Sequence, residues 1–215
     1  DAKGASSGWG DAKGASSGWG DAKGASSGWG DAKGASSGWG GQGSNIYPIL
    51  PGGNVRPVTV TFTWSKPNNT APYQLDIFDE DNKVLHTVSA ADTFAAVDLG
   101  KLNLTPDQTY FWKVSVPGNS DLRCEKAEFT FATEAEYART ARQVGTSKIY
   151  KSAGPAVQRL MEAAALEKGE WYYDAEQYYS MLLKKYPEDN LVRMMYAAFW
   201  MRGALEMKAK AVGNN

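Results

Sequence analysis

The sequence has 215 residues, of which 42% are hydrophobic and 22% charged, and its formal net charge is −1. This length can hold one domain and a second, smaller unit, and the near-neutral charge provides no basic field to attract a nucleic acid. No apolar run approaches the roughly 18 residues of a membrane-spanning helix, and Cys124, the only cysteine, excludes an internal disulfide.

The first forty residues are four identical copies of Asp-Ala-Lys-Gly-Ala-Ser-Ser-Gly-Trp-Gly, termed the repeat arm (1–40). Identity at every position is more than folding requires, and it indicates recent duplication or engineering. Each copy has three glycines and a single large apolar side chain, so the arm alone cannot bury enough surface to offset the entropy of ordering it. As an isolated chain it should be a charge-balanced tether with an end-to-end distance of about 35 Å.

Three interpretations of the repeat arm stay open. The composition is typical of a flexible spacer. Alternatively, arms of neighbouring chains order one another, with Trp9, Trp19, Trp29 and Trp39 packing at fixed intervals and Asp/Lys pairs setting the register. In the third interpretation the exposed tryptophans bind glycans or a cell wall.

Residues 41–57 are predicted to be a linker that contains a candidate edge strand. The stretch 46–50 is apolar, and Pro48 and Pro51 confine such a strand to the edge of a sheet. The sequence Pro51-Gly-Gly-Asn54 is then expected to turn the chain into the main strand.

Residues 58–132 alternate between apolar and polar side chains, as strands with one buried face do. We expect a core that contains Trp64, Tyr110 and Trp112. Turn residues separate the alternating segments, which favours an antiparallel β-sandwich. The predicted strands are 58–64, 73–77, 84–88, 110–116 and 127–131.

Trp64, late in an early strand, and the run Leu104-Thr-Pro-Asp-Gln-Thr-Tyr110 before an aromatic strand resemble a fibronectin type III domain, one of the immunoglobulin-like sandwiches. The resemblance covers about 56–133. It implies that Tyr110 is a corner residue, with its ring in the core and its hydroxyl bonded to the backbone upstream. Such sandwiches serve as adhesive modules, spacers and receptor domains alike, so the resemblance implies a fold rather than a function.

Residues 133–215 change to a helical period. Thr133-Glu-Ala-Glu136 is a capping-box signature, which predicts a helix from there to about Gly145. Three more amphipathic helices are predicted at 155–168, 172–185 and 188–211, and together they form α-hairpins.

The last two helices resemble about one and a half tetratricopeptide repeats. Large and small side chains fall at the spacings of such a repeat, and the resemblance implies that they pack one helix against the next. At this length the full concave groove that repeat arrays use for peptides is not expected. The residues concerned are Tyr172, Ala175, Tyr179, Leu183, Ala197 and Trp200.

The sequence offers little for catalysis. His86 is the only histidine, and no cysteine or second histidine stands at metal-ligand spacing, which excludes a zinc site or a serine–histidine triad. The acidic run 79–82 lacks the glycine and the distal glutamate of a calcium loop, so a solvated turn is favoured. No glycine loop precedes a helix as phosphate-binding motifs require. We therefore expect no enzyme, no metal and no cofactor.

Two hypotheses of function remain. In the first, the chain is a structural subunit of an extracellular or cell-envelope assembly, with the arm joining copies into a filament. In the second, it is an envelope adaptor that binds another protein through its helices and uses the arm as a tether. The periplasm or the cell surface is expected in both, because the first residue is Asp1 rather than Met, as removal of a signal peptide would leave it.

Overall fold

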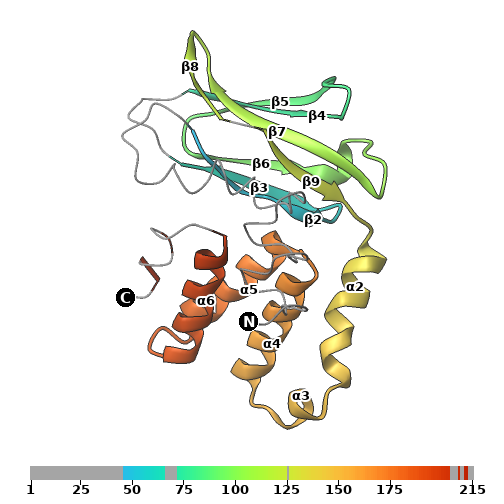
Figure 1. Ribbon diagram of the computed structural model, residues 1–215, viewed down its shortest axis with the longest axis vertical. Coiled ribbons are helices and arrows are strands. Elements are labelled where there is room, and N and C mark those ends of the chain that lie inside the picture. Colours follow the sequence, from blue (N-terminus) through green and yellow to red (C-terminus); the bar gives the residue numbers. More distant parts are fainter. Residues whose placement is uncertain (1–45, 66–71, 125, 204–207, 209–210, 213–215) are drawn as a thin grey trace, which may run out of the picture.

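The computed structural model describes residues 46–65, 72–124, 126–203, 208 and 211–212. The repeat arm and the ordering expected for its four tryptophans lie outside the described residues. Two β-sheets are followed by a group of helices, with the sheets at the top of Figure 1 and the helices below them.

The sheets face each other as two layers. A three-stranded sheet has the order β1-β3-β6, and a six-stranded sheet has the order β2-β9-β7-β4-β5, with β8 paired to β7. The strands are β1 (Pro48–Leu50), β2 (Gly53–Val55), β3 (Thr59–Trp64), β4 (Tyr73–Phe78), β5 (Val84–Ala90), β6 (Phe94–Asp98), β7 (Gln108–Val116), β8 (Asn119–Arg123) and β9 (Ala127–Phe131). A short 3₁₀ turn, η1 (Leu99–Lys101), follows β6.

The expectation of a purely antiparallel sandwich is wrong at one strand. β2 pairs in parallel with β9, whereas every other pairing between named strands is antiparallel. The sequence predicts a turn at its residues Gly53 and Asn54, because Gly-Gly-Asn is a strong turn signal in isolation. Both residues lie in β2 instead, because the edge of β9 offers hydrogen-bond partners to this segment, and Gly53 has a positive φ of +65° within it.

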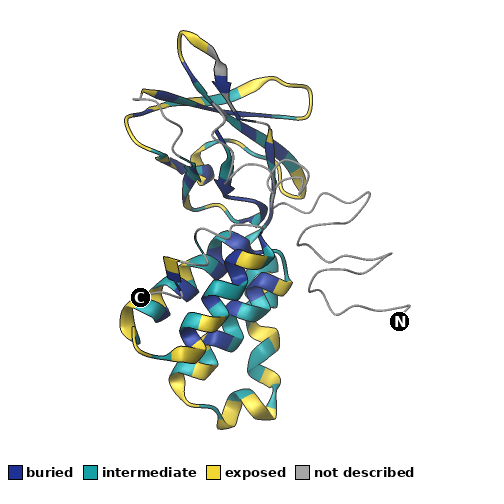
Figure 2. Cartoon of the chain, turned by 60° about the vertical axis from the view of Figure 1, so that its left-hand side comes forward, coloured by how far each residue is buried: buried dark blue, intermediate teal, exposed yellow. Residues whose placement is uncertain are grey.

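Alternation explains which side chains form the core of the sandwich. In β3 the apolar residues Val60, Phe62 and Trp64 are buried, while the threonines between them are more exposed. In β7 the same alternation buries Tyr110 and Trp112. Figure 2 shows the buried residues concentrated between the sheets and on the inner sides of the helices.

The helices follow the last strand, β9, along the chain. α2 (Glu134–Gln143) starts at the predicted capping box, with Thr133 as its N-cap, and leads through a 3₁₀ turn, η2 (Val144–Thr146), and α3 (Lys148–Ser152) into α4 (Pro155–Lys168). α5 (Tyr172–Lys185) and α6 (Asn190–Arg202) complete the group. α4 packs on α5, and α5 packs on α6.

The last predicted helix, 188–211, is corrected at both ends. The Asp189 side chain accepts hydrogen bonds from the backbone N–H groups of Leu191 and Val192, so it caps the helix and the first helical residue is Asn190. At the other end α6 stops at Arg202, and Gly203 lies in a turn, with its N–H group donating to the Phe199 carbonyl. The described residues beyond this turn, Lys208, Ala211 and Val212, are again helical. A glycine immediately after a periodic segment is a common end of a helix.

Candidate functional site: the junction of the sheets and the helices

The segment from Ile46 to Pro51, which contains β1, belongs to two cores at once. Ile46 is buried with the sandwich residues, whereas Ile49 and Leu50 are buried with the helices. The indole Nε1 of Trp112, in the centre of the sandwich, donates a hydrogen bond of 3.1 Å to the carbonyl oxygen of Pro51. The stretch predicted to be a linker is therefore a structural part of both units, which meet at what we term the junction.

Gly53 and Asn54 of β2 lie directly against the turn that joins α4 to α5. The Asn54 N–H group donates to the Glu170 carbonyl at 2.8 Å, and its side-chain amide donates to the Gly169 carbonyl at 3.0 Å. Gly53 has a φ of +65°, and a Cβ atom there would lie 2.2 Å from the Glu170 carbonyl oxygen. Only glycine fits both this conformation and this approach.

Arg56, the residue directly after β2, also holds the junction together. Its Nε donates to Asp174 Oδ1 of α5 at 3.0 Å, and its Nη1 lies 3.3 Å from the Glu134 carboxylate of α2. The guanidinium also lies over the ring of Tyr137, 4.3 Å from its centroid. One side chain thus ties the end of β2 to two helices.

Burial shifts the pKa values of two groups at the junction. Desolvation raises the pKa of the Asp174 carboxyl group, and the neighbouring Arg56 partly opposes that rise. The pKa of Tyr137 is raised as well, chiefly by burial. A buried carboxylate held by one arginine fixes geometry more than it adds stability, because desolvation offsets much of the attraction.

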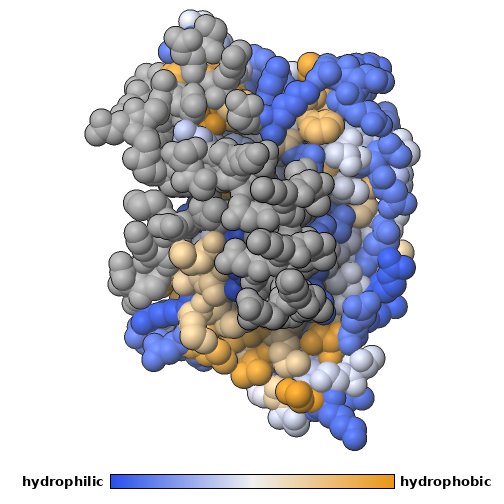
Figure 3. All heavy atoms as spheres, viewed as in Figure 1, coloured by the Kyte–Doolittle hydropathy of each residue, from blue (hydrophilic) through white to orange (hydrophobic). Residues whose placement is uncertain are grey.

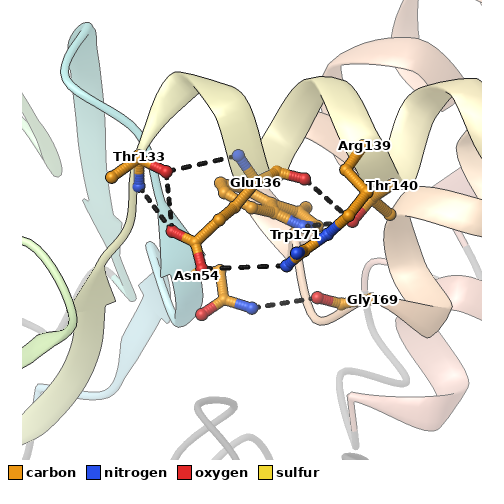
Figure 4. A network of polar contacts seen from close by, with 7 residues as sticks. All are labelled: Asn54, Thr133, Glu136, Arg139, Thr140, Gly169 and Trp171. Carbon is orange, nitrogen blue, oxygen red and sulfur yellow. Dashed lines mark hydrogen bonds and ion pairs between the residues drawn. The ribbon is translucent and has the colours of Figure 1, made fainter.

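A polar network links α2 to the same turn. Thr133 and Glu136 form the reciprocal bonds of the capping box, and the Thr140 hydroxyl donates to the Glu136 carbonyl. Trp171 Nε1 in turn donates to Thr140 Oγ1 at 3.3 Å. Figure 4 shows these residues beside the bond between Asn54 and Gly169, so strand, helix and turn are fixed at one place.

Inside the helices, a buried ion pair fixes the position of α6 relative to α4. Arg202 donates to both carboxylate oxygens of Glu167, at 2.6 and 2.8 Å, and the Tyr179 hydroxyl donates to the same group at 2.9 Å. Desolvation raises the pKa of Glu167 against the opposing effect of Arg202. The three groups satisfy one another where water is excluded.

The predicted core residues share one cluster. Trp64, Tyr110 and Trp112 are all buried in it, Trp112 completely. The Tyr110 hydroxyl accepts a hydrogen bond of 2.8 Å from the Thr105 N–H group, which is the contact expected of a corner tyrosine. Phe62 packs edge-on against Trp112, with ring centroids 5.3 Å apart.

The predicted helix-packing residues also lie together, in the second cluster. Tyr172, Ala175, Tyr179 and Trp200 are buried there, while Leu183 and Ala197 are half-buried against it. Trp9, Trp19, Trp29 and Trp39 lie outside the described residues.

Sequence reasoning missed the residues that make the junction. Arg56 and Asp174 stand 118 positions apart and no local pattern connects them, while Asn54 is predicted only as part of a turn. The available signal was that Asp174 lies in the first turn of an amphipathic helix, beside an aromatic run that requires a partner surface.

His86 and the acidic run 79–82, the candidate metal ligands in the sequence, lie within the described residues. No group of three or more His, Cys, Asp or Glu side chains in that part of the chain is arranged to hold a metal ion. His86 is half-buried on β5 opposite Ile77. In the acidic turn, Asp79 Oδ1 accepts from the Lys83 N–H group. Within the same residues, no helix combines the length and the apolar character needed to cross a bilayer.

Comparisons with known proteins give little. No family model and no curated protein matches the sequence. A solved structure described as "Biofilm associated protein - BSP domain" is 20% identical over 38% of this chain and 14% of its own, with a TM-score of 0.27. Astrotactin-2, described as a perforin-like membrane protein involved in neuronal development, is 10% identical over 73% of this chain and 33% of its own, with a TM-score of 0.24. Likenesses this weak carry no argument.

Proposed function

We propose that this chain is a non-catalytic structural subunit of an extracellular or cell-envelope assembly. A fibronectin type III-like sandwich and a tetratricopeptide-like helical unit form its globular body. The repeat arm contributes contacts between subunits, which join copies into a fibre. The observation that carries the proposal is the combination of four identical Trp-containing copies with a body whose two parts are held together by hydrogen bonds and by buried side chains of β1 among the helices.

The repeat arm lacks the apolar side chains for a core of its own. One tryptophan per ten residues cannot form a core within a single arm, so burial of these side chains requires another arm or another surface. Each copy has one Asp and one Lys, so stacked copies stay electrically neutral. Glycines at three of the ten positions allow close approach of neighbouring backbones.

The first test replaces Trp9, Trp19, Trp29 and Trp39 by serine in the full chain. We expect the fibres of the parent protein to disappear from electron micrographs, because apolar burial contributes roughly 25 cal/mol per Å² and no other large apolar side chain is present in the arm. A matched control replaces Ser7, Ser17, Ser27 and Ser37 by alanine, and it should form fibres as the parent does. Fibres of the serine variant would show that the subunits join without the tryptophans.

Trypsin gives an independent readout of the same proposal. Each copy contains one lysine, at positions 3, 13, 23 and 33, so an exposed arm is cut readily. Assembled parent protein should resist cleavage there, while the serine variant should lose its arm within minutes. Location is tested by fractionation of the source cells, where the protein should be found outside the cytoplasm.

The adaptor hypothesis is favoured by one observation, the exposed apolar side chains of the helices, which include Met181, Leu191, Met194 and Met201. It predicts that removal of the arm tryptophans leaves the oligomeric state unchanged. The same micrographs therefore separate the two functions.

A further inference from the structure

α6 is apolar around almost its whole circumference. Of its 13 residues, only Asn190, Arg193 and Arg202 and the hydroxyl of Tyr196 are polar. One face, with Val192, Tyr196, Phe199 and Trp200, is buried in the helical cluster. A helix that is apolar on all sides is normally covered on all sides, so the opposite face requires an explanation.

That opposite face is open. The side chains of Leu191, Met194 and Met201 are 42%, 60% and 53% exposed, and the half-buried Ala198 completes the row. We term these four residues the α6 face. Figure 3 shows apolar surface at the lower left of the molecule, where Figure 1 places α6. Single exposed apolar side chains are ordinary, but a continuous row on one helix is typical of a contact surface.

The spacing of the row is that of a helix–helix seam. Successive members are three, four and three residues apart, which is the a/d spacing of a coiled coil. The charged side chains of the helix leave this seam neutral. Arg193 is paired with Glu188 at 3.1 Å, and Arg202 is bonded to the buried Glu167.

The row is also symmetric about its midpoint. Leu191 and Met201 lie five residues on either side of Tyr196, and Met194 and Ala198 lie two residues on either side. In an antiparallel pair of identical helices, positions equally far from the midpoint meet across the two-fold axis. Each Met194 would then meet the small Ala198 of the second copy, which lets the two helices approach closely.

We propose that the α6 face binds the α6 face of a second copy of this chain, as an antiparallel pair with its two-fold axis near Tyr196. The contact goes beyond the function proposed above, because it joins globular bodies and does not require the arm. Three half-exposed side chains per copy cover much less than the roughly 800 Å² per partner of a stable complex, so the contact is weak. We expect a dissociation constant between about 10 μM and 1 mM.

A weak contact of this kind becomes effective once another contact holds the bodies together. Neighbouring subunits in a fibre have an effective concentration of about 1 mM, at or above the expected dissociation constant. The α6 face would then add lateral or axial bonds between bodies that the arms have already brought close. In free protein at low concentration the pair separates.

The test uses the full chain in which the four arm tryptophans are serine, so that arm contacts do not obscure the equilibrium. Sedimentation equilibrium of this protein should show a mass that rises towards that of a dimer as concentration increases. Adding Met194→Glu should weaken the dimer at least tenfold, because a carboxylate would be buried against the second copy. Met181→Glu is the matched control, since Met181 is a 49% exposed methionine on α5, outside the α6 face.

A charge-complementation experiment tests the antiparallel register. Met194→Glu and Ala198→Lys should each prevent dimer formation alone, and an equimolar mixture should restore it in a salt-sensitive way. Circular dichroism of each variant establishes that the helices remain folded. Restoration in the mixture requires residue 194 of one copy to lie beside residue 198 of the other, so failure to restore the dimer overturns the pairing.

Other outcomes also decide against the proposal. An equilibrium that Met194→Glu leaves unchanged would show that the α6 face is not the contact. A lower melting temperature in a protein that is already monomeric would show that another part of the same chain covers the face. Fibres formed by the serine variant would contradict the role of the arm, while the monomer–dimer equilibrium of its soluble fraction would still test the α6 face.

Discussion

The close contact between β2 and the α4–α5 turn depends most directly on Gly53. An alanine there would need a φ of +65° and would place its Cβ atom 2.2 Å from the Glu170 carbonyl oxygen, which belongs to the backbone and cannot rotate away. We predict that Gly53→Ala lowers the free energy of unfolding by about 2–4 kcal/mol, from backbone strain together with overpacking.

Gly118 provides the matched control for this prediction. It also has a positive φ, +82°, but a Cβ atom there would have no neighbour within 4 Å. Gly118→Ala should therefore cost only the backbone strain, about 1 kcal/mol. Urea unfolding of both variants measures the difference, and equal losses would mean that β2 does not press against the α4–α5 turn.

The Glu136 carboxyl group makes the stability of the capping box depend on pH. Its hydrogen bonds from the Thr133 backbone and hydroxyl lower the pKa of its carboxyl group. A lowered pKa in the folded state means that the carboxylate contributes stability above its unfolded pKa, near 4.5. This contribution is lost as pH falls through the folded pKa.

We predict that the stability advantage of the parent over Glu136→Gln grows between pH 3 and pH 6 and is then constant to pH 7. Urea unfolding of both proteins across this range gives the difference. Burial raises the pKa of Glu167, Asp174 and Glu176, but these groups titrate alike in the two proteins and cancel. An advantage that is independent of pH would show that the carboxylate does not cap α2.

At the scale of elements, Arg56 connects β2 with α5 and α2 through one side chain. Its partner Asp174 is 6% exposed, whereas its partner Glu134 is 59% exposed. Water screens the exposed pair, so the two ion pairs should differ in strength although they share a guanidinium.

Double-mutant cycles measure this difference. The coupling energy between Arg56 and Asp174 should be about 1.5–3 kcal/mol, as for hydrogen bonds between charged groups away from water. Between Arg56 and Glu134 it should be below about 1 kcal/mol. Alanine substitutions at the three positions, alone and in pairs, supply both cycles. A stronger coupling to Glu134 would contradict the burial of the Asp174 pair.

Local patterns predicted the elements that carry strong local signals. Three helices, 134–143, 155–168 and 172–185, follow from a capping box, a proline at the first position and an aromatic period. The strands with strict alternation, such as β3 and β7, were predicted for the same reason. The strand β6, which is short and has an exposed phenylalanine, and β8, which is mostly polar, lack that signal and were missed.

The junction could not be predicted from local patterns, because its residues acquire their roles only from distant partners. β2 is a strand because β9 pairs with it, and Gly53 is needed because Glu170 lies against it. The open face of α6 was visible as an apolar helix, but its exposure depends on where α4 and α5 lie. Sequence reasoning thus identifies the two units but not the residues that join them.

At the scale of the whole molecule, the two units share one body. Buried side chains of β1 lie among the helices, the sandwich tryptophan Trp112 donates to Pro51, and Tyr173 of α5 accepts from the Thr61 N–H group of β3. These contacts span the chain from residue 49 to residue 173, so the angle between sheets and helices is set by packing. A fixed angle suits a building block, because a regular fibre requires every copy to have the same shape.

The central claim is that the repeat arm joins copies of this body, and the most direct measurement is sedimentation velocity of the intact chain beside residues 41–215. Both proteins are measured at one concentration, salt and pH. The account predicts that the intact chain sediments as a polymer, while residues 41–215 sediment as a monomer in exchange with a weak dimer. A polymer formed by residues 41–215 would contradict the claim.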